Sequence, residues 1–511
     1  MQLNLEFVKQ QKDRLHSVTV GPLHEMPERV LQFGEGNFLR AFVDWKINEL
    51  NRRGLFNGKV VVVQPLPDGM AEELNEQNCV YTVVRRGLQQ GQPVEHSDII
   101  TSISRAINPY THWNEFLACA ENPDLRYIVS NTTEAGIVYV ETPQPNGECP
   151  ASFPAKVTTL LFKRFHHFSG ARDKGMIIIP CELIDRNGHA LKENILAHAE
   201  SWQLGNDFVQ WINESCFFYD TLVDRIVPGF PRDEAEDLYR KLGYEDELLV
   251  ASELFHLWVI EGNGTARKEL RFVDAGLNVV WTDNLRPYRT LKVHILNGTH
   301  TSFAIPAFLA GKDTVRQSLE DEAIGRFVQQ AVFDEIVPTL DAPDDVRKKF
   351  AETVLERFRN PFLKHGLLAI TLNSVSKFKV RVLPSLLRYQ QAHDAIPQAL
   401  SFSLAALIAF YRGEFNGSTS LVGWRGGKHY LVQDDPQHLE FFASTHAQCR
   451  RDEKKLCETI LGNVQLWDMD LNTVPGLTHA VVRHYSNILH DGVMESLAIM
   501  SERKTHDDGT N

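Results

Sequence analysis

The chain of 511 residues exceeds the ~250–300 residues that one hydrophobic core usually serves, so at least two domains are expected. Hydrophobic residues make up 43% and charged residues 23%, which excludes a disordered, collagen-like or coiled-coil chain. Lys and Arg total 53 against 66 Asp and Glu, and the formal net charge of −13 argues against binding to nucleic acid or anionic membranes. An anionic ligand would therefore need a local concentration of positive charge.

The seven cysteines are scattered and form no CxxC pair, so neither a zinc ribbon nor a disulfide framework is predicted. No HExxH helix or cysteine–histidine cluster occurs either, and we expect no metal site. Residues 1–18 lack the basic and apolar segments of a signal peptide. The most apolar stretch, Leu400 to Tyr411, is shorter than the ~20 residues that span a bilayer and is expected to be a core helix. These features favour the reducing cytoplasm.

The first half of the chain alternates short apolar runs with helical patterns. Lys59 to Val63 is a continuous β-branched run, the pattern of a parallel strand buried on both faces. Helical spacing appears at Leu39 to Leu50 and again at Pro154 to Phe168. The alternation predicts an α/β domain with a Rossmann-like, doubly wound sheet. The other apolar runs are Arg29 to Phe33, Tyr127 to Ser130 and Met176 to Pro180.

The pattern changes after about Trp281, where long helical patterns replace the β-branched runs. We expect the boundary in the polar residues 282–288. The prediction is a Rossmann-like NAD-binding domain at 1–285 and a mainly α-helical substrate and catalytic domain at 286–511. The glycine-rich segment Ser418 to His429 has no assigned role and indicates either a loop at the cleft or a contact surface. The predicted helices are Thr314 to Ile336, Asp344 to Arg359, Pro384 to His393 and Pro397 to Arg412.

A glycine turn follows the first predicted strand. Gly34 suits the tight turn, and Gly36 suits a close approach of the backbone to a pyrophosphate. The helix that begins after them would offer unpaired N–H groups and a positive dipole end to phosphates. The third glycine of the usual fingerprint is replaced by Leu39. The strand–turn–helix context nevertheless favours a dinucleotide site.

The end of the second strand of such a sheet reports the choice of cofactor. Here the strand ends at Val63-Gln64-Pro65, with no Arg or Lys directly after it to accept the 2′-phosphate of NADP. No acid stands at the strand end, and Asp68 comes four residues after Gln64. NAD is the predicted cofactor.

Three polar residues interrupt an otherwise apolar helical pattern at the start of the second domain. On an α-helix, Lys292 and His300 lie about 80° apart around the axis, and Asn297 lies about 60° from His300. A lysine can move a proton, an amide can stabilise a developing alkoxide, and an imidazole can orient a hydroxyl. Alone, this spacing is more often a solvated helix face. Following a dinucleotide-binding fold, it predicts hydride transfer to a ketone.

These segments together resemble the polyol-specific long-chain dehydrogenase/reductase family, also called the mannitol dehydrogenase family. Its K-x4-N-x2-H motif is matched by Lys292, Asn297 and His300. The residues Phe33 to Ala41 resemble its cofactor turn, and Ser130 to Gly136 resemble its T-E-x-G segment. The resemblance spans nearly the whole chain, and QFGEGNFLRAFVDW, SNTTEAGI, IIIPCELIDRNG, TLVDRIV and AALIAFYRGE are most similar to members that act on D-tagaturonate.

The resemblance implies a metal-independent, NAD-dependent reductase that interconverts D-tagaturonate and D-altronate. Lys292 would be the general acid/base, and His300 would orient the substrate. Asn297 would supply one N–H of an oxyanion hole. The family's second asparagine is replaced by Leu183, so that role is assigned to Asn187. The implied cofactor-binding residues are Phe33, Gly34, Gly36, Asn37, Phe38, Thr133 and Glu134, with Glu134 gating proton release, and Asp224 would lie near the reacting centre.

The resemblance also places substrate-binding basic residues at Lys377, Lys379 and Arg381. A strand would present all three on one side, whereas a helix would still place Lys377 and Arg381 on one face. The alternative is a solvated basic patch. Any of the three could hold the carboxylate of a sugar acid. A second basic group, Arg357, Arg359 and Lys364, is expected to be structural.

Three other interpretations stay open from the sequence. One is a metal-dependent uronate isomerase or dehydratase, which activity retained in EDTA would exclude. A fructuronate reductase or a mannitol-type dehydrogenase differs only at sugar stereocentres, which motifs do not resolve. A non-catalytic NAD-binding sensor of sugar acids is a remote alternative. A small anionic sugar acid is the expected partner, without nucleic acid or membrane, in a monomer or small homo-oligomer.

Overall fold

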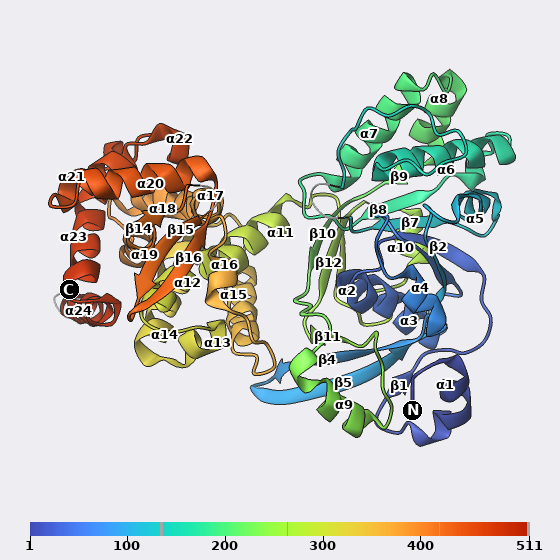
Figure 1. Ribbon diagram of the computed structural model, residues 1–511, viewed down its shortest axis with the longest axis horizontal. Helices are drawn as coiled ribbons and strands as arrows, with labels where there is room; N and C mark the ends of the chain where they lie inside the picture. The colour runs from blue at the N-terminus through green and yellow to red at the C-terminus, as the bar shows by residue number, and fades with distance from the viewer. Residues whose placement is uncertain (133–135, 263, 418–419, 508–511) are drawn as a thin grey trace. The chain divides into compact units, whose positions relative to one another are not determined.

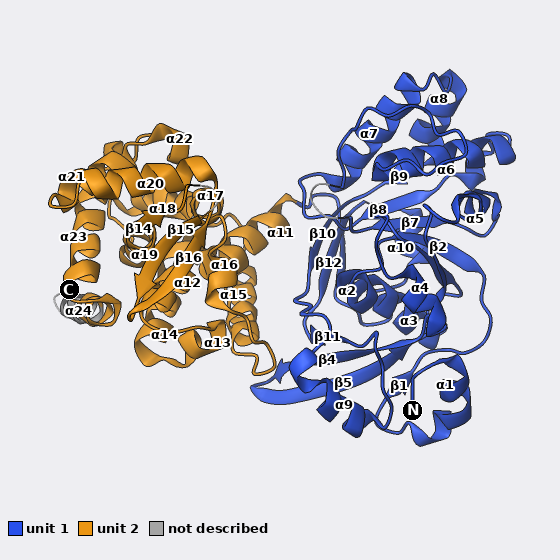
Figure 2. Cartoon of the chain, in the orientation of Figure 1, with its two compact units in different colours: residues 1–285 blue, residues 286–511 orange. Residues whose placement is uncertain are grey.

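The computed structural model describes residues 1–132, 136–262, 264–417 and 420–507, with side chains as far as residue 500. The chain divides into two compact units, Met1–Leu285 and Arg286–Asn511 (Figure 2). Each unit has its own hydrophobic core. In the described part of the chain, no helix combines the length and apolar composition needed to cross a membrane.

A six-stranded parallel sheet forms the centre of unit 1, in the order β6-β3-β2-β7-β8-β9 (Figure 1). The order reverses between β2 and β7, as in a doubly wound dinucleotide-binding sheet. The predicted Rossmann-like fold is therefore confirmed. The strands are β2 (Glu28–Phe33), β3 (Lys59–Val63), β6 (Ile103–Ile107), β7 (Tyr127–Ser130), β8 (Ile177–Pro180) and β9 (Phe217–Phe218).

The β-branched run of β3 is continuous because both faces of the sheet are covered. Val61 and Val63 pack in one core, and Val60 and Val62 pack in the core on the opposite face. Figure 1 shows α6, α7 and α8 on one side of the sheet and α2, α3 and α4 on the other. These helices are α2 (Asn37–Leu39), α3 (Trp45–Arg52), α4 (Ala71–Glu76), α6 (Phe153–His167), α7 (Asn187–Ser201) and α8 (Asn206–Ser215), and α5 (Trp113–Ala118) packs in the same core as α6.

Two smaller sheets complete unit 1. One has the order β1-β5-β4-β11 and the other β10-β12-β13. Their strands are β1 (Thr19–Val20), β4 (Tyr81–Gln89), β5 (Gln92–Ile100), β11 (Val250–Glu253), β10 (Asp220–Asp224), β12 (Leu257–Glu261) and β13 (Val279–Thr282). The remaining helices of the unit are α1 (Leu5–Gln11), α9 (Ala235–Leu242) and α10 (Thr265–Glu269).

Unit 2 is mainly helical, and two apolar helices form its centre. α19 (Gln398–Phe410) is buried from Ala399 to Phe410. The prediction of a core helix in this apolar stretch is therefore confirmed. α12 (Gly298–Leu309) packs against it within the same core. Around them lie α11 (Arg286–Leu291), α13 (Val315–Glu320), α14 (Glu322–Gln329), α15 (Asp344–Phe358), α16 (Leu367–Ile370), α17 (Ser374–Arg381), α18 (Leu383–His393), α20 (Pro436–Gln448), α21 (Glu453–Leu461), α22 (Val464–Trp467), α23 (Leu477–His490) and α24 (Val493–Asp507).

Two expectations for unit 2 were wrong. The helix predicted over Thr314 to Ile336 is broken at Asp321, whose carboxylate accepts hydrogen bonds from the first N–H groups of α14. The loop alternative for Ser418 to His429 is also wrong, because this segment contributes to a three-stranded antiparallel sheet, β14-β15-β16. The strands are β14 (Gly413–Phe415), β15 (Ser420–Arg425) and β16 (Lys428–Gln433), and residues 418 and 419 lie outside the described ones.

Candidate active site

The glycine turn lies at the carboxyl end of β2, beside the point where the strand order of the sheet reverses. Gly34 has φ +121°, a backbone conformation that residues other than glycine rarely adopt. A Cβ on Gly34 would lie 3.0 Å from Leu39 Cδ1 and 3.1 Å from the Asn131 carbonyl oxygen. Gly36 differs, because a Cβ there would meet no atom within 4 Å. Gly34 is thus required by the fold, while Gly36 leaves open space where a ligand could approach the backbone.

The other residues of the predicted cofactor turn have different surroundings. Phe33 is fully buried and packs edge-on against Phe116 and Phe153, so its side chain belongs to the core. Asn37 is exposed and its Oδ1 accepts a hydrogen bond of 2.8 Å from Arg40 Nη2. Phe38 is half-buried and stacks on a neighbouring ring. Among the predicted cofactor residues of this turn, Asn37 and Phe38 therefore have side chains that a ligand could reach.

At the end of β3, the side-chain amide of Gln64 shapes the following loop. Its Nε2 donates to the carbonyl oxygens of Leu66 and Pro67 at 2.9 Å, and its Oε1 accepts from Ala71 N at 3.2 Å. Gln64 is buried, so these bonds are screened from water. Gln64, at the strand end that was expected to report cofactor choice, thus sets the path of the backbone in the loop after β3.

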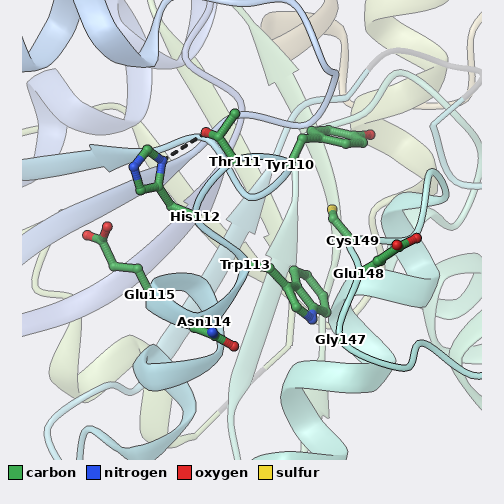
Figure 3. A pocket seen from close by; sticks show the side chains of 9 residues that line it. All are labelled: Tyr110, Thr111, His112, Trp113, Asn114, Glu115, Gly147, Glu148 and Cys149. Carbon is green, nitrogen blue, oxygen red and sulfur yellow. Dashed lines mark hydrogen bonds between the residues drawn. The ribbon is translucent and has the colours of Figure 1, made fainter.

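A hollow of about 640 Å³ lies beside this strand end (Figure 3). Tyr110 forms part of its wall and donates a hydrogen bond of 3.1 Å to the Pro65 carbonyl oxygen, directly after β3. Lys156 Nζ donates to the Tyr110 hydroxyl at 3.0 Å. Among the described residues, none of those predicted to carry chemistry lines this hollow. The hollow is formed by residues Tyr110, Thr111, His112, Trp113, Asn114, Glu115, Gly147, Glu148 and Cys149.

A buried glutamate that the sequence analysis did not select holds the segment after β7. Glu182 accepts hydrogen bonds from Ser130 Oγ at 3.0 Å and from Thr132 N at 2.9 Å. Burial raises the pKa of Glu182, against the effect of these bonds. Glu182 therefore fixes the residues that lead into the T-E-x-G segment. Thr133 and Glu134, both predicted to bind the cofactor, lie outside the described residues.

The structure speaks against the oxyanion role that was expected for Asn187. Its Nδ2 donates to the carbonyl oxygens of Pro180 and Glu182, both at 3.1 Å. Its Oδ1 accepts from Gly188 N at 2.9 Å and from Thr221 N at 2.8 Å. The fully buried amide therefore ties β8, α7 and β10 together, and its N–H groups already have backbone acceptors. The predicted substrate residue Asp224 ends the neighbouring strand β10 and is also buried.

The polar cluster of unit 2 lies on a helix that changes its winding. Lys292 to Asn297 form a π-helical segment, η6, between α11 and α12. In an α-helix, residues five apart point about 140° away from each other. The wider π turn, with its i to i+5 bonds, brings Lys292 and Asn297 closer to one line, and such turns are frequent at functional sites. Both side chains are partly exposed, whereas His300 at the start of α12 is buried.

The His300 ring is held between two other rings. Phe358 stacks on it with a centroid distance of 4.0 Å and an interplanar angle of 20°. His365 meets it edge-on at 5.0 Å and 83°. Nε2 of His300 is buried without a hydrogen-bond partner among the described residues. The pKa of this imidazole lies well below its usual value, first because of burial and then because of nearby basic groups that disfavour a second positive charge, so the ring is neutral. Those groups are the titratable His365 and the cations Arg357, Arg381 and Lys377.

The basic segment is the helix α17, so the helical alternative holds for it. Lys377 Nζ donates to the Ile370 carbonyl oxygen at 2.9 Å, and burial followed by repulsion from Arg381 lowers the pKa of Lys377 to about 8. Lys379 instead forms an ion pair of 3.0 Å with Asp468. Among the three predicted cations, only Lys377 and Arg381 act on the pKa of His300. The ammonium group of Lys379 is thus engaged by Asp468 and does not join Lys377 and Arg381 near His300.

α17 is in contact with the polar helix. The Arg381 carbonyl oxygen lies 3.0 Å from His294 Nδ1. A Cβ on Gly298 would come within 2.9 Å of the same oxygen, so glycine permits this close packing. The two segments that the sequence selected independently are therefore neighbours in unit 2.

The small sheet of unit 2 anchors the other end of α17. Asp434, directly after β16, accepts hydrogen bonds from Val375 N at 3.2 Å, from the Tyr411 hydroxyl and from His438 Nδ1 at 3.0 Å. The Gln433 carbonyl oxygen accepts from Asn373 N at 3.0 Å. The sheet to which the segment without an assigned role contributes thus supports the basic helix through the end of β16. No sequence pattern indicated that this sheet and α17 are neighbours, because they are distant along the chain.

The strand order of unit 1, with a glycine turn at the switch point, defines a dinucleotide-binding dehydrogenase of the Rossmann type. Two family models assign it more closely. The mannitol dehydrogenase Rossmann domain matches residues 28–274, and the mannitol dehydrogenase C-terminal domain matches residues 284–489. The chain belongs to the mannitol dehydrogenase family.

Relatives and solved structures agree with this assignment. The altronate oxidoreductase of Yersinia enterocolitica is 46% identical over 94% of this chain and 98% of its own. That of Escherichia coli strain 536 is 46% identical over 93% of this chain and 97% of its own. D-sorbitol dehydrogenase in substrate-free form has the same fold, with a TM-score of 0.79 at 20% identity over 97% of this chain and 100% of its own. The ternary complex of Pseudomonas fluorescens mannitol 2-dehydrogenase with NAD and D-mannitol gives 0.71 at 20% identity, over 98% and 100%.

Proposed function

We propose that the protein is an NAD-dependent oxidoreductase that interconverts D-tagaturonate and D-altronate. The observation that carries the proposal is the contact between the Lys292–His300 helix and the basic helix α17. It puts a proton donor, an amide and two cations in one unit of an acidic protein. The altronate oxidoreductases, 46% identical over nearly the whole chain, support the same substrate.

The cofactor residues fit a dinucleotide at the glycine turn. Gly36 leaves its Cβ position open, and the helix that follows presents its N-terminus there. Asn37 and Phe38 are the reachable side chains beside it. When bound, NADH would supply the hydride. The mannitol 2-dehydrogenase complex, whose ligands are NAD and D-mannitol, supports this cofactor.

In the proposed mechanism, Lys292 donates a proton to the ketone oxygen of tagaturonate, and the reverse reaction returns the proton to it. The amide of Asn297, aligned with Lys292 by the π turn, donates a hydrogen bond to the same oxygen as negative charge develops there. His300 is neutral and can accept or donate a hydrogen bond to a substrate hydroxyl without adding charge. Lysine and amide together would supply the polarisation for which other enzymes use a metal.

The carboxylate of the substrate would meet Lys377 and Arg381. Arg381 can bind it in bidentate fashion, and Lys377 adds a point charge. Lys379, already paired with Asp468, is left out of this role. The proposal thus narrows the three predicted cations to two.

We further propose a cytoplasmic location and a monomer or small homo-oligomer. The seven cysteines are free thiols, which is consistent with a reducing compartment.

Oxidation of NADH with D-tagaturonate, D-fructuronate and D-fructose, measured side by side, tests the proposal. Tagaturonate is expected to give the highest kcat/KM, with the same rate in excess EDTA. Preference for fructuronate would assign the sister activity, and preference for fructose would assign a polyol dehydrogenase. NADH binding without turnover of any of the three would indicate a sensor.

A further inference from the structure

One histidine beside His300 has no role so far. His365 lies in the connection between α15 and α16, and its ring meets the His300 ring edge-on with centroids 5.0 Å apart. Phe358 occupies the other face of His300 at 4.0 Å. The proposed orienting histidine therefore has one apolar and one polar neighbour.

The backbone around His365 is fixed by the start of α13. Its carbonyl oxygen accepts a hydrogen bond of 3.0 Å from Val315 N. Gly366 forms an isolated bridge with Thr314, and Leu367 N donates to the Asp313 carbonyl oxygen at 2.9 Å. Bonds on both sides of His365 hold its position in the chain. The ring is consequently presented by a defined backbone.

The ring itself is less satisfied than its backbone. It is partly exposed, and no described residue donates a hydrogen bond to it or accepts one from it. Burial lowers the pKa of His365, so near neutral pH the ring is an uncharged donor and acceptor. The cations Arg357, Lys377 and Arg381 act on the same neighbour, His300. A polar ring with open nitrogens, in edge-on contact with the histidine on which these three cations act, suits an anionic ligand with oxygen acceptors.

We propose that His365 contacts the substrate and donates a hydrogen bond to its carboxylate, so that it helps to distinguish sugar acids from neutral sugars. This inference rests on the proposed function. The alternative is that His365 only packs against His300. The two roles differ in what a substitution does to charged and neutral ligands.

D-altronate and D-altritol provide the matched pair, because they share one carbon skeleton and differ by a carboxylate in place of a CH2OH group. His365→Phe keeps a ring against His300 and removes the donor. Hydrogen bonds to charged groups are worth enough that its loss should raise the inhibition constant of altronate against tagaturonate about tenfold to a hundredfold. Altritol inhibition should change less than about threefold, since altritol lacks the charged acceptor. His365→Asn, which retains an N–H donor, should recover part of the difference.

His393→Phe is the matched control, because this exposed histidine lies on α18 and has no proposed role. If His365→Phe raises the inhibition constants of altronate and altritol by the same factor, or changes neither, the ratio of the two constants is unchanged. That result would assign His365 to packing and overturn the proposal. If His365→Phe does not fold, His365→Leu carries the same comparison. A wrong substrate assignment would look different, because the unaltered enzyme would then fail to reduce tagaturonate.

Discussion

The KM for the sugar acid should rise above about pH 8, and Lys377→Arg should remove that rise. A lysine is charged below its pKa, so its attraction for a carboxylate is present at low pH and lost as the pH passes the pKa. For Lys377 that pKa is about 8, because burial and the charge of Arg381 disfavour the ammonium form. An arginine keeps its charge across this range.

The size of the effect follows from the fraction of charged lysine. One pH unit above the pKa, about one Lys377 in eleven remains protonated. If only the charged form binds the carboxylate well, KM should rise by about tenfold between pH 7 and pH 9. A bound carboxylate favours the ammonium form, so the pKa of Lys377 is higher in the complex, and the rise of KM begins at the pKa of the free enzyme and levels off only above the pKa of the complex.

Initial rates of NADH oxidation at several tagaturonate concentrations give KM and kcat at each pH. Reduction consumes a proton, so kcat is expected to fall with pH in both proteins, and only the ratio of their KM values is diagnostic. A KM that stays flat in the unaltered enzyme would refute the reasoning. An equally steep rise in Lys377→Arg would assign the titration to another group.

Three further outcomes are expected. Gly34→Ala should lower the melting temperature, because alanine would have to adopt a positive φ at a cost of about 1–2 kcal/mol and would crowd Leu39. Gly36→Ala should leave the melting temperature unchanged and weaken NADH binding. Equal changes of melting temperature in the two variants would contradict this. Lys46 is fully buried, its pKa is well below normal and its Nζ has no hydrogen-bond partner among the described residues. Lys46→Met should therefore raise the melting temperature by about 2 °C or more by calorimetry, and less so at pH 10, where the unfolded lysine also loses its proton; a lower melting temperature would show that Lys46 has an unseen role. Lys379→Met should leave the KM for tagaturonate within about twofold, since an exposed ion pair is worth little, and a large increase would return Lys379 to the site.

The sequence predicted those elements whose burial dictates a simple pattern. Lys59–Val63 and Tyr127–Ser130 are strands with the predicted bounds because the sheet is covered on both faces. The hairpin β15–β16 was missed, although Gly426 and Gly427 both have positive φ and form a two-residue turn of the kind that joins antiparallel strands. Its alternating, half-exposed strands gave no apolar run. The turn signal was present and was interpreted as a loop.

The candidate site was predictable as residue types but not as geometry. Nothing in the apolar spacing around Lys292 indicates a π turn, because one extra residue per turn leaves the composition unchanged. Asn187 was selected from the resemblance, and only the hydrogen bonds of its side chain to the backbone reveal a structural role. His365 and Asp434 carry no local motif. Their importance depends on contacts with residues far away in the chain.

The most direct test of the account is the effect of Lys292→Ala on turnover and on cofactor binding. If Lys292 is the proton donor, kcat for tagaturonate reduction should fall by about 10²- to 10⁴-fold. The dissociation constant for NADH, measured by fluorescence, should stay within about twofold, since the glycine turn belongs to the other unit. A kcat near that of the unaltered enzyme would contradict the assignment of Lys292 and the mechanism built on it.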